Sequence, residues 1–292
     1  MLMILGATSA AHAKSRPTNA NAEIEALVAQ QVGAADTRSE PDEAKAPYAD
    51  GAMICVTDGK DGNREGPIVD PTGIGLDNLQ GHDEKHVEVQ RSRDGRTAWV
   101  SFETDVTLAY YGRDPDTAEA VDMKMEETYR VSDVLVQIDG RWRIVASVWS
   151  EGVANAEANK AARSRNPPRF TPLPASAKPD ASLVAALTAW NGGAVAATAA
   201  KRTVVFGSAP GERSTDGAAF RTAWLAGWSG HVGVEPAAIV ALAPSGTTGW
   251  ILADLVRDKG SHKVPFRVLL VFDRLGDGGW QLVHAHFATR AR

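Results

Sequence analysis

Two acid–arginine pairs are the residues of this sequence best suited to catalysis. Glu103 pairs with Arg130 and Asp254 pairs with Arg267, at matching positions of two stretches that align with each other. Burial raises the pKa of a carboxyl group and a neighbouring guanidinium lowers it. One hypothesis is that Glu103 or Asp254 acts as a general base next to a substrate carbonyl, whose oxygen the arginine polarises. The alternative is a structural ion pair between neighbouring strands.

A tryptophan precedes each acid by four residues, Trp99 before Glu103 and Trp250 before Asp254. Side chains alternate along a strand, so each tryptophan shares a face with its acid. If that face is concave, each pocket holds a carboxylate beside aromatic side chains. The two tryptophans would then bind substrate together with the two arginines, although core packing is the first interpretation of the tryptophans and pocket lining the second.

His284 and His286 lie two residues apart on an expected strand and therefore point the same way. Two imidazoles on one face could contact a substrate or ligate a metal. Two ligands do not complete a metal site, and the first half has Ala146 and Val148 at the matching positions. We therefore expect substrate-binding histidines in a pocket wall, and no metal.

Two further features have ordinary explanations. Asp61, Asn63 and Glu65 are spaced like the start of a calcium-binding loop, but Thr72 stands where that loop needs a bidentate glutamate. We expect a polar loop there. Cys55 lies in an apolar segment and is expected to be a small buried residue rather than a nucleophile.

The composition excludes several classes of protein. The chain has 292 residues, 31 basic and 36 acidic, with a net charge of −5 and no basic block, which disfavours binding to nucleic acids or to anionic membranes. A single cysteine excludes an intrachain disulfide. The sequence has no G-x-S-x-G elbow, P-loop, H-E-x-x-H or dinucleotide-binding motif. We expect no cofactor.

A proline-rich segment divides the chain. Residues 165–180 contain five prolines, which disfavour both helix and sheet and favour an extended spacer. The segment predicts a boundary between a first domain at 14–164 and a second domain at 181–292. A chain of this length is enough for two domains with their own cores.

The two halves read as a tandem repeat. Arg93–Val106 aligns with Ala243–Val256, and Glu127–Trp149 aligns with Val264–Phe287 with one extra residue in a turn. The main difference is an acidic insertion, Tyr111–Asp122, which we expect at the tip of a lengthened hairpin.

Each half is expected to combine helices with a terminal run of antiparallel strands. Asp-Gly and Ser-Gly turns separate segments rich in β-branched and aromatic residues, which predicts hairpins. Alanine-rich amphipathic stretches precede them, at Ala22–Val32, Ala181–Trp190 and Gly217–Trp228. The fold class predicted from these elements is α+β.

The order of these elements, and above all the closing segment GGWQLVHAHFA at Gly278–Ala288, resembles the SnoaL-like branch of the nuclear transport factor 2-like (ketosteroid isomerase-like) superfamily. The resemblance is good over Asp180–Arg292 and weaker over Ala22–Val153. It implies two tandem cone-shaped barrels, each a curved antiparallel sheet wrapped around N-terminal helices with a pocket at its wide end. It also implies that such units pair through their sheets, here within one chain, with a homodimer as a further candidate assembly.

The first residues suggest export. An uncharged apolar run at 1–13 ends in Ala11-His12-Ala13, a small-x-small pattern that signal peptidase accepts, so the mature chain would start at Lys14. No window is apolar enough for a membrane span. We expect a periplasmic or secreted protein.

The sequence therefore predicts an exported protein that binds a small hydrophobic ligand or serves as an association module. The alternative is a lyase, isomerase or cyclase that uses a pocket carboxylate as its general base. The surroundings of Glu103 and Asp254 distinguish the two, because a closed bidentate ion pair favours a structural role.

Overall fold

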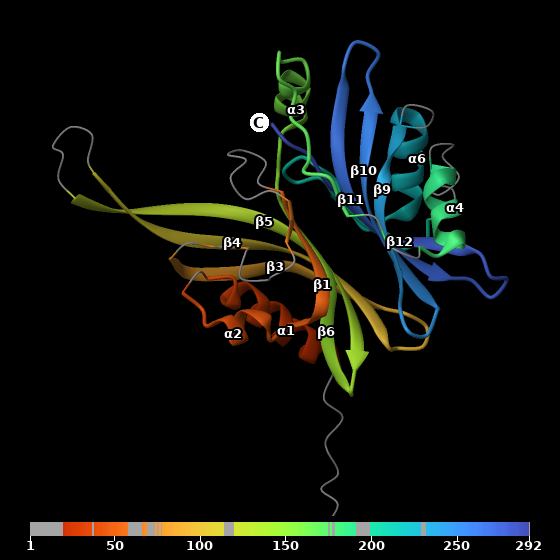
Figure 1. The fold of residues 1–292 in the computed structure, drawn as a ribbon, viewed down its shortest axis with the longest axis horizontal. Helices are drawn as coiled ribbons and strands as arrows, with labels where there is room; N and C mark the ends of the chain where they lie inside the picture. Colours follow the sequence, from red (N-terminus) through yellow and green to blue (C-terminus); the bar gives the residue numbers. More distant parts are fainter. Residues whose placement is uncertain are drawn as a thin grey trace, which may run out of the picture.

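Two six-stranded sheets with the same strand order form the framework of the protein (Figure 1). The structure is a computed structural model, and it describes residues 20–36, 38–57, 66–68, 74, 76, 78–113, 120–174, 176, 179–190, 199–228 and 232–291. The first sheet has the order β2-β1-β6-β5-β4-β3 and the second has the order β8-β7-β12-β11-β10-β9. Each strand of one sheet thus has a counterpart at the same place in the other.

The strands of the first sheet are β1 (Tyr48–Thr57), β2 (Gly66–Ile68), β3 (Leu79–Arg91), β4 (Thr97–Arg113), β5 (Ala120–Ile138) and β6 (Arg141–Glu151). Those of the second are β7 (Val204–Phe206), β8 (Arg213–Ser214), β9 (Val232–Leu242), β10 (Thr248–Asp258), β11 (Lys263–Arg274) and β12 (Trp280–Ala288). The helices are α1 (Ala20–Ala34), α2 (Pro41–Lys45), α3 (Asn155–Ala162), α4 (Ala181–Trp190) and α6 (Gly217–Gly227).

The expectation of purely antiparallel sheets is wrong at one place in each half. β1 runs parallel to β6, and β7 runs parallel to β12, so both sheets are mixed. Turn residues identify strands joined by hairpins, but a long connection leaves no local signal of how its strands pair. Among the described residues neither sheet closes into a barrel, because each keeps two edge strands.

The hairpin turns follow from their sequences. Asp139 and Gly140 both have positive φ angles, 50° and 75°, and directly join the paired residues Ile138 and Arg141. A two-residue turn of this kind matches the right-handed twist of its strands, and it favours Asp-Gly because few other residues tolerate positive φ.

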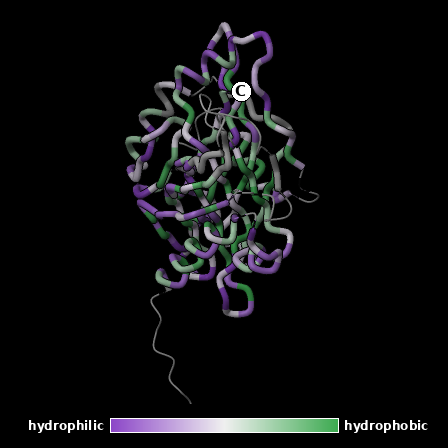
Figure 2. Tube along the Cα trace, turned by 90° about the vertical axis from the view of Figure 1, so that its left-hand side faces the viewer, coloured by the Kyte–Doolittle hydropathy of each residue, from purple (hydrophilic) through white to green (hydrophobic). Residues whose placement is uncertain are grey.

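Both faces of the central strands of each sheet are buried, whereas the edge strand β3 is mostly exposed or half-buried. One face of the first sheet packs against α1, in a core that includes Ile24, Val28 and Val32 of that helix. The corresponding face of the second sheet packs against α3, α4 and α6. The remaining faces meet each other, and Figure 1 shows α1 and α2 on the outer side of the first sheet and α4 and α6 on the outer side of the second. In Figure 2 hydrophobic segments accordingly gather in the middle of the molecule.

The core between the sheets takes residues from both halves of the chain. Trp99, Val134 and Val148 come from the first sheet, and Trp250 and Leu269 come from the second. Cys55 is fully buried in this same core, as expected from its apolar surroundings. The two halves therefore share a continuous hydrophobic interface.

The segment around the predicted boundary belongs structurally to the second half. Ala158 and Ala162 of α3 lie in the core of the second sheet. Leu173 of the proline-rich segment is buried in the core between the sheets. The chain after β6 thus wraps around the second sheet before α4 begins.

Several predictions concern residues outside the described ranges. These are the signal segment 1–13, the calcium-like residues Asp61, Asn63 and Glu65 with Thr72, and the tip of the acidic hairpin at 114–119. The described arms of that hairpin continue the β4–β5 ladder as far as the pair Arg113 and Ala120. In the described parts of the chain, no helix has both the length and the apolar character of a membrane span.

Candidate functional site

The Asp254–Arg267 pair is a closed ion pair. The residues are cross-strand partners in the β10–β11 ladder. Arg267 Nε lies 2.8 Å from Asp254 Oδ1, and Arg267 Nη2 lies 2.9 Å from Asp254 Oδ2. Arg267 also donates to the carbonyl oxygen of Thr171 and stacks on Phe170, at 4.7 Å from the ring centroid. Both carboxylate oxygens are thus engaged by a fully buried guanidinium, the arrangement that favours a structural role.

The Glu103–Arg130 pair is arranged differently. The two residues are cross-strand partners in the β4–β5 ladder, but Glu103 is bonded to His86, with 2.9 Å between Oε2 and Nδ1. Arg130 is 2% exposed and donates to backbone carbonyls. Its acceptors are the carbonyl oxygens of Gly207, Ser208, Ala209 and Glu151. Burial lowers the pKa of Arg130 to about 10, and the negative charges of Glu103 and Glu212 oppose this shift.

The face that carries these residues is not the concave, helix-covered one. Trp99 and Trp250 pack between the two sheets, whereas Ile251, Ala253 and Leu255 face the helices. The alternation of side chains correctly places each tryptophan on its acid's face. The two tryptophans pack in the core between the sheets, but Asp254 lines a cavity of about 630 Å³ together with residues of the proline-rich segment.

The two histidines also lie inside the structure rather than in a pocket wall. His286 bridges the halves: its Nε2 lies 2.7 Å from Ser150 Oγ and its Nδ1 lies 2.9 Å from Ser132 Oγ. His284 is 1% exposed, and neither of its ring nitrogens has a hydrogen-bond partner among the described residues. Burial lowers the pKa of His284 to about 3, although the Val204 backbone nearby favours its protonation. The described residues contain no cluster of three or more potential metal ligands.

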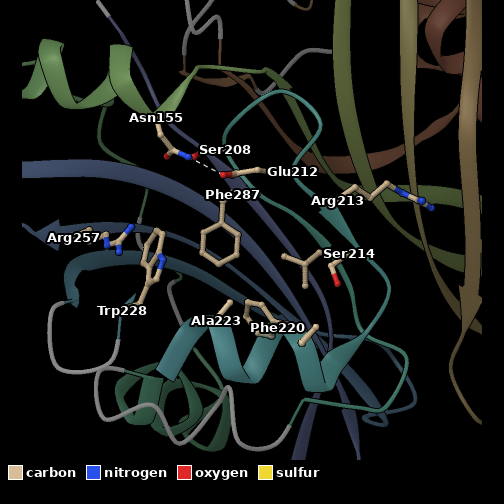
Figure 3. A pocket seen from close by; sticks show the side chains of 13 residues that line it. Asn155, Ser208, Glu212, Arg213, Ser214, Phe220, Ala223, Trp228, Arg257 and Phe287 are labelled. Atoms are coloured by element: carbon tan, nitrogen blue, oxygen red, sulfur yellow. Dashed lines mark hydrogen bonds between the residues drawn. The ribbon is translucent and has the colours of Figure 1, made fainter. Parts of the chain in front are cut away.

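The candidate functional site is a cavity between α6 and the second sheet (Figure 3). It has a volume of about 360 Å³, which lies within the range of small-molecule sites. Its apolar lining is formed by Val205, Phe220, Trp228 and Phe287 together with alanines of α6. In Figure 3 the aromatic rings of Phe220, Trp228 and Phe287 surround the hollow.

Polar side chains also line the cavity, those of Asn155, Ser208, Glu212, Arg213, Ser214 and Arg257. Arg257 lies over the Trp228 ring, with its Cζ atom 4.3 Å from the centroid, and its Nη2 donates to the carbonyl oxygen of Gly227 at 2.6 Å. Glu212 accepts hydrogen bonds from Asn155 Nδ2 at 2.8 Å and from the backbone N–H of Ala209 at 3.0 Å. The cavity lining therefore includes two arginines, Arg213 and Arg257, and one hydrogen-bonded carboxylate beside its apolar side chains.

Arg257 is half-buried and keeps hydrogen-bonding capacity toward the cavity. Among the residues that the structure describes it forms no ion pair, and its buried Nε has no partner. Burial lowers its pKa, opposed by the charge of Glu212. By contrast, Arg213 points away from the cavity in Figure 3 and pairs with Glu88 of the first sheet at 3.2 Å. Arg257 is thus the cation available to a ligand.

Local sequence explains how the cavity is built. The Asp216 side chain caps α6 by accepting from the Ala218 N–H at 2.8 Å. At Gly217 a Cβ would lie 1.8 Å from the carbonyl oxygen of Ala200, so only glycine lets the helix start this close to the chain. At Gly207 a Cβ would lie 2.4 Å from Glu212 Oε2, so glycine also leaves room for the carboxylate.

The sequence predictions missed these residues, although a signal was present. Phe287 is an odd number of residues from His284 and from His286, and Arg257 is an odd number of residues from Asp254. Phe287 and Arg257 therefore lie on the opposite faces of their strands from the histidines and from Asp254. The pocket on the helix-covered face could have been found by following Leu255, Arg257, Ala285 and Phe287.

A second buried polar group lies in the first half and was also missed. Asp133 Oδ1 accepts hydrogen bonds from Gln31 Nε2 at 3.0 Å and from Ser147 Oγ at 2.5 Å. Gln31 also donates to Tyr48 Oη at 3.1 Å, and Trp149 donates to Ser147. Burial raises the pKa of Asp133 to about 7, and burial together with Asp133 raises that of Tyr48.

The chain is similar in fold to small proteins that span about half of its length. No family model and no curated protein matches the sequence. Among solved structures, an NTF2-like protein from Cytophaga hutchinsonii is 15% identical, covers 46% of this chain and 99% of its own, and has a TM-score of 0.33. Aln2 from Streptomyces is 20% identical, covers 47% and 94%, and has a TM-score of 0.34. ActVI-ORFA from Streptomyces coelicolor is 16% identical, covers 46% and 98%, and has a TM-score of 0.32. The structural neighbours are thus NTF2-like and ketosteroid isomerase-like proteins at low sequence identity.

Proposed function

We propose that this protein binds a small organic anion with an aromatic or aliphatic body in the cavity between α6 and the second sheet. The observation that supports the proposal is Arg257, a guanidinium that lines an aromatic cavity and has no ion-pair partner in the described chain. A carboxylate or sulfonate next to Arg257 would gain a charge-assisted hydrogen bond, and the rings would bury the apolar body.

Binding without catalysis fits the carboxylates better than a lyase or isomerase mechanism does. Asp254 has both oxygens engaged by Arg267. Glu212 receives two hydrogen bonds that hold its side chain in place. A general base needs a carboxylate free to take a proton from substrate. The catalytic alternative through Asp254 therefore has less support than ligand binding, and Glu103 is bonded to His86 rather than to Arg130.

We also propose that the halves are two tandem units of one cone-shaped fold, 14–164 and 181–292, joined by 165–180, and that the protein is exported. The identical strand order of the two sheets supports the first statement, and the apolar run before Ala13 supports the second. The N-terminal residue of the protein recovered from a periplasmic extract tests export. Lys14 is the expected residue, and an intact Met1 would contradict the proposal.

The binding proposal is tested with a pair of fluorescent probes. Anilinonaphthalene sulfonate carries an anionic group on an aromatic body, and N-phenylnaphthylamine has a similar body without the charge. We expect the wild-type protein to bind the anionic probe more tightly than the neutral one. The variant Arg257→Gln should lose about tenfold or more in affinity for the anion and little for the neutral probe, because a charge-assisted hydrogen bond contributes about 1.5–3 kcal/mol.

A matched control uses another arginine stacked on tryptophan. Arg274 lies over Trp280, with its Cζ atom 5.2 Å from the ring centroid, outside the cavity. Arg274→Gln removes the same charge and should leave both affinities unchanged. Equal losses in the two variants, or equal affinities of the wild-type protein for both probes, would exclude Arg257 as the anion-binding group.

A further inference from the structure

A second cavity, with several basic side chains in its lining, lies beside α3. It has a volume of about 630 Å³ and is lined by one face of α3 and by the turn between β10 and β11. The helix contributes Ala156, Asn159, Lys160 and Arg163, which recur at the three- and four-residue spacing of a single helix face. The turn contributes Lys259, Ser261 and His262.

The lining residues of this basic cavity are unusual in a protein of net charge −5. Lys160, Arg163 and Lys259 contribute three basic side chains, and no carboxylate is among the described residues that line the cavity. The nearest acidic residues in sequence are Glu157 on α3 and Asp258 on β10, and Asp258 is used to accept the backbone N–H of Gly260 at 2.7 Å. None of the three cations forms an ion pair with a described residue.

The turn is held in position by its own hydrogen bonds. His262 Nε2 lies 2.9 Å from Asn159 Oδ1, and His262 Nδ1 lies 3.0 Å from Ser261 Oγ. The Lys259 N–H donates to the carbonyl oxygen of His262 at 3.0 Å. The imidazole thus ties the turn to α3, so that the cations of the two elements face one cavity. The three cationic side chains are exposed, and the hydrogen bonds of the turn fix the spacing of the two elements that carry them.

We propose that this basic cavity is a binding site for a phosphate group, held by Lys160 and Arg163 of α3 and by Lys259 of the turn. Two elements approach the group from different sides, and Arg163 can present two parallel donors to its oxygens. Burial and the charge of Arg257 lower the pKa of Lys259, so a bound anion would relieve a repulsion that the unliganded chain carries. The site is separate from the aromatic cavity and does not depend on the organic anion proposed there.

The test measures binding of inorganic phosphate by calorimetry and by amide chemical shifts, at constant ionic strength. We expect saturable binding, with shifts concentrated at residues 159–163 and 259–262. The double variant Lys259→Gln/Arg163→Gln should raise the dissociation constant about tenfold or more. A control double variant, Lys201→Gln/Arg141→Gln, removes the same charge from two exposed positions elsewhere and should change it by less than about twofold.

Three results would overturn the proposal. The first is no saturable binding of phosphate to the wild-type chain. The second is an equal loss of affinity in both double variants, which would indicate a general effect of net charge. The third result would come from a binding measurement with phosphatidylcholine vesicles prepared with and without an anionic phospholipid. Binding to the anionic vesicles without binding to inorganic phosphate would show a membrane-facing surface rather than a site for a single group.

Discussion

Asp133 illustrates how burial changes the chemistry of a single residue. Its side chain is enclosed between α1 and the first sheet, and its Oδ2 has no hydrogen-bond partner among the described residues. The hydrogen bonds from Gln31 and Ser147 stabilise the ionised form, but burial outweighs them and raises the pKa to about 7. Folding therefore favours the protonated carboxyl group.

This pKa predicts how stability depends on pH. The contribution of Asp133 is fully present below about pH 4, the pKa of an unfolded aspartate, and is lost as the pH rises through about 7. The neutral variant Asp133→Asn should lack this loss. The free energy of unfolding of Asp133→Asn, relative to that of the wild type, should therefore increase by about 4 kcal/mol between about pH 4 and pH 7. Urea unfolding at a series of pH values measures the difference.

The comparison with a variant is needed because His284 gives the opposite trend. Its pKa of about 3 lies below that of an unfolded histidine, so its contribution is present above about pH 6.5 and is lost on acidification. The control Asp139→Asn changes an exposed aspartate in a turn and should run parallel to the wild type. A parallel profile for Asp133→Asn as well would show that Asp133 is ionised throughout.

At the scale of elements, the start of α6 depends on close packing against the preceding chain. Gly217 lies directly after the capping residue Asp216 and against the carbonyl oxygen of Ala200. A methyl group there would push the helix away from that segment, and α6 carries Phe220 on the cavity wall. Stability and ligand binding should therefore both respond to this position.

We predict that Gly217→Ala lowers the free energy of unfolding by roughly 1–3 kcal/mol, the cost typical of overpacking. The control Gly81→Ala adds the same methyl group where no atom lies within 4 Å and the backbone conformation is ordinary, and should cost much less. Chemical denaturation of both variants measures the difference. Equal stabilities would contradict the close approach of α6 to Ala200.

The elements themselves could largely be predicted from the sequence, but their burial could not. Ala181–Trp190 is a helix with the expected bounds, and the Asp-Gly turns join strands as expected. The tryptophan–acid alternation was also correct. The sequence could not show whether Trp250 and Asp254 face the helices or the other sheet. Both faces of β10 are largely buried, so no polar face distinguishes its two sides in the sequence.

At the scale of the molecule, the two halves are tied by polar contacts as well as by the core between the sheets. Arg130 of the first sheet donates to three consecutive carbonyl groups, Gly207, Ser208 and Ala209, in the loop before β8. The N–H of Val153 donates to the same Ser208 carbonyl at 2.9 Å. Gly207 and Ser208 line the aromatic cavity, so the first half shapes the ligand site of the second.

Arg130→Met should therefore act on both stability and binding. It leaves several buried carbonyl groups without a donor, and we expect a loss of about 3 kcal/mol or more, together with weaker binding of the anionic probe. The control Arg143→Met removes a donor to one carbonyl, that of Ala46, within the first half. It should cost about 1 kcal/mol and leave binding intact. Unchanged probe affinity in Arg130→Met would contradict the coupling of the halves.

A crystal structure of the protein with anilinonaphthalene sulfonate bound tests the central claim most directly. Our account predicts the aromatic rings of the probe between Trp228 and Phe287, with a sulfonate oxygen within hydrogen-bonding distance of Arg257. A probe found beside Asp254 and the proline-rich segment, with the aromatic cavity filled by side chains, would contradict it.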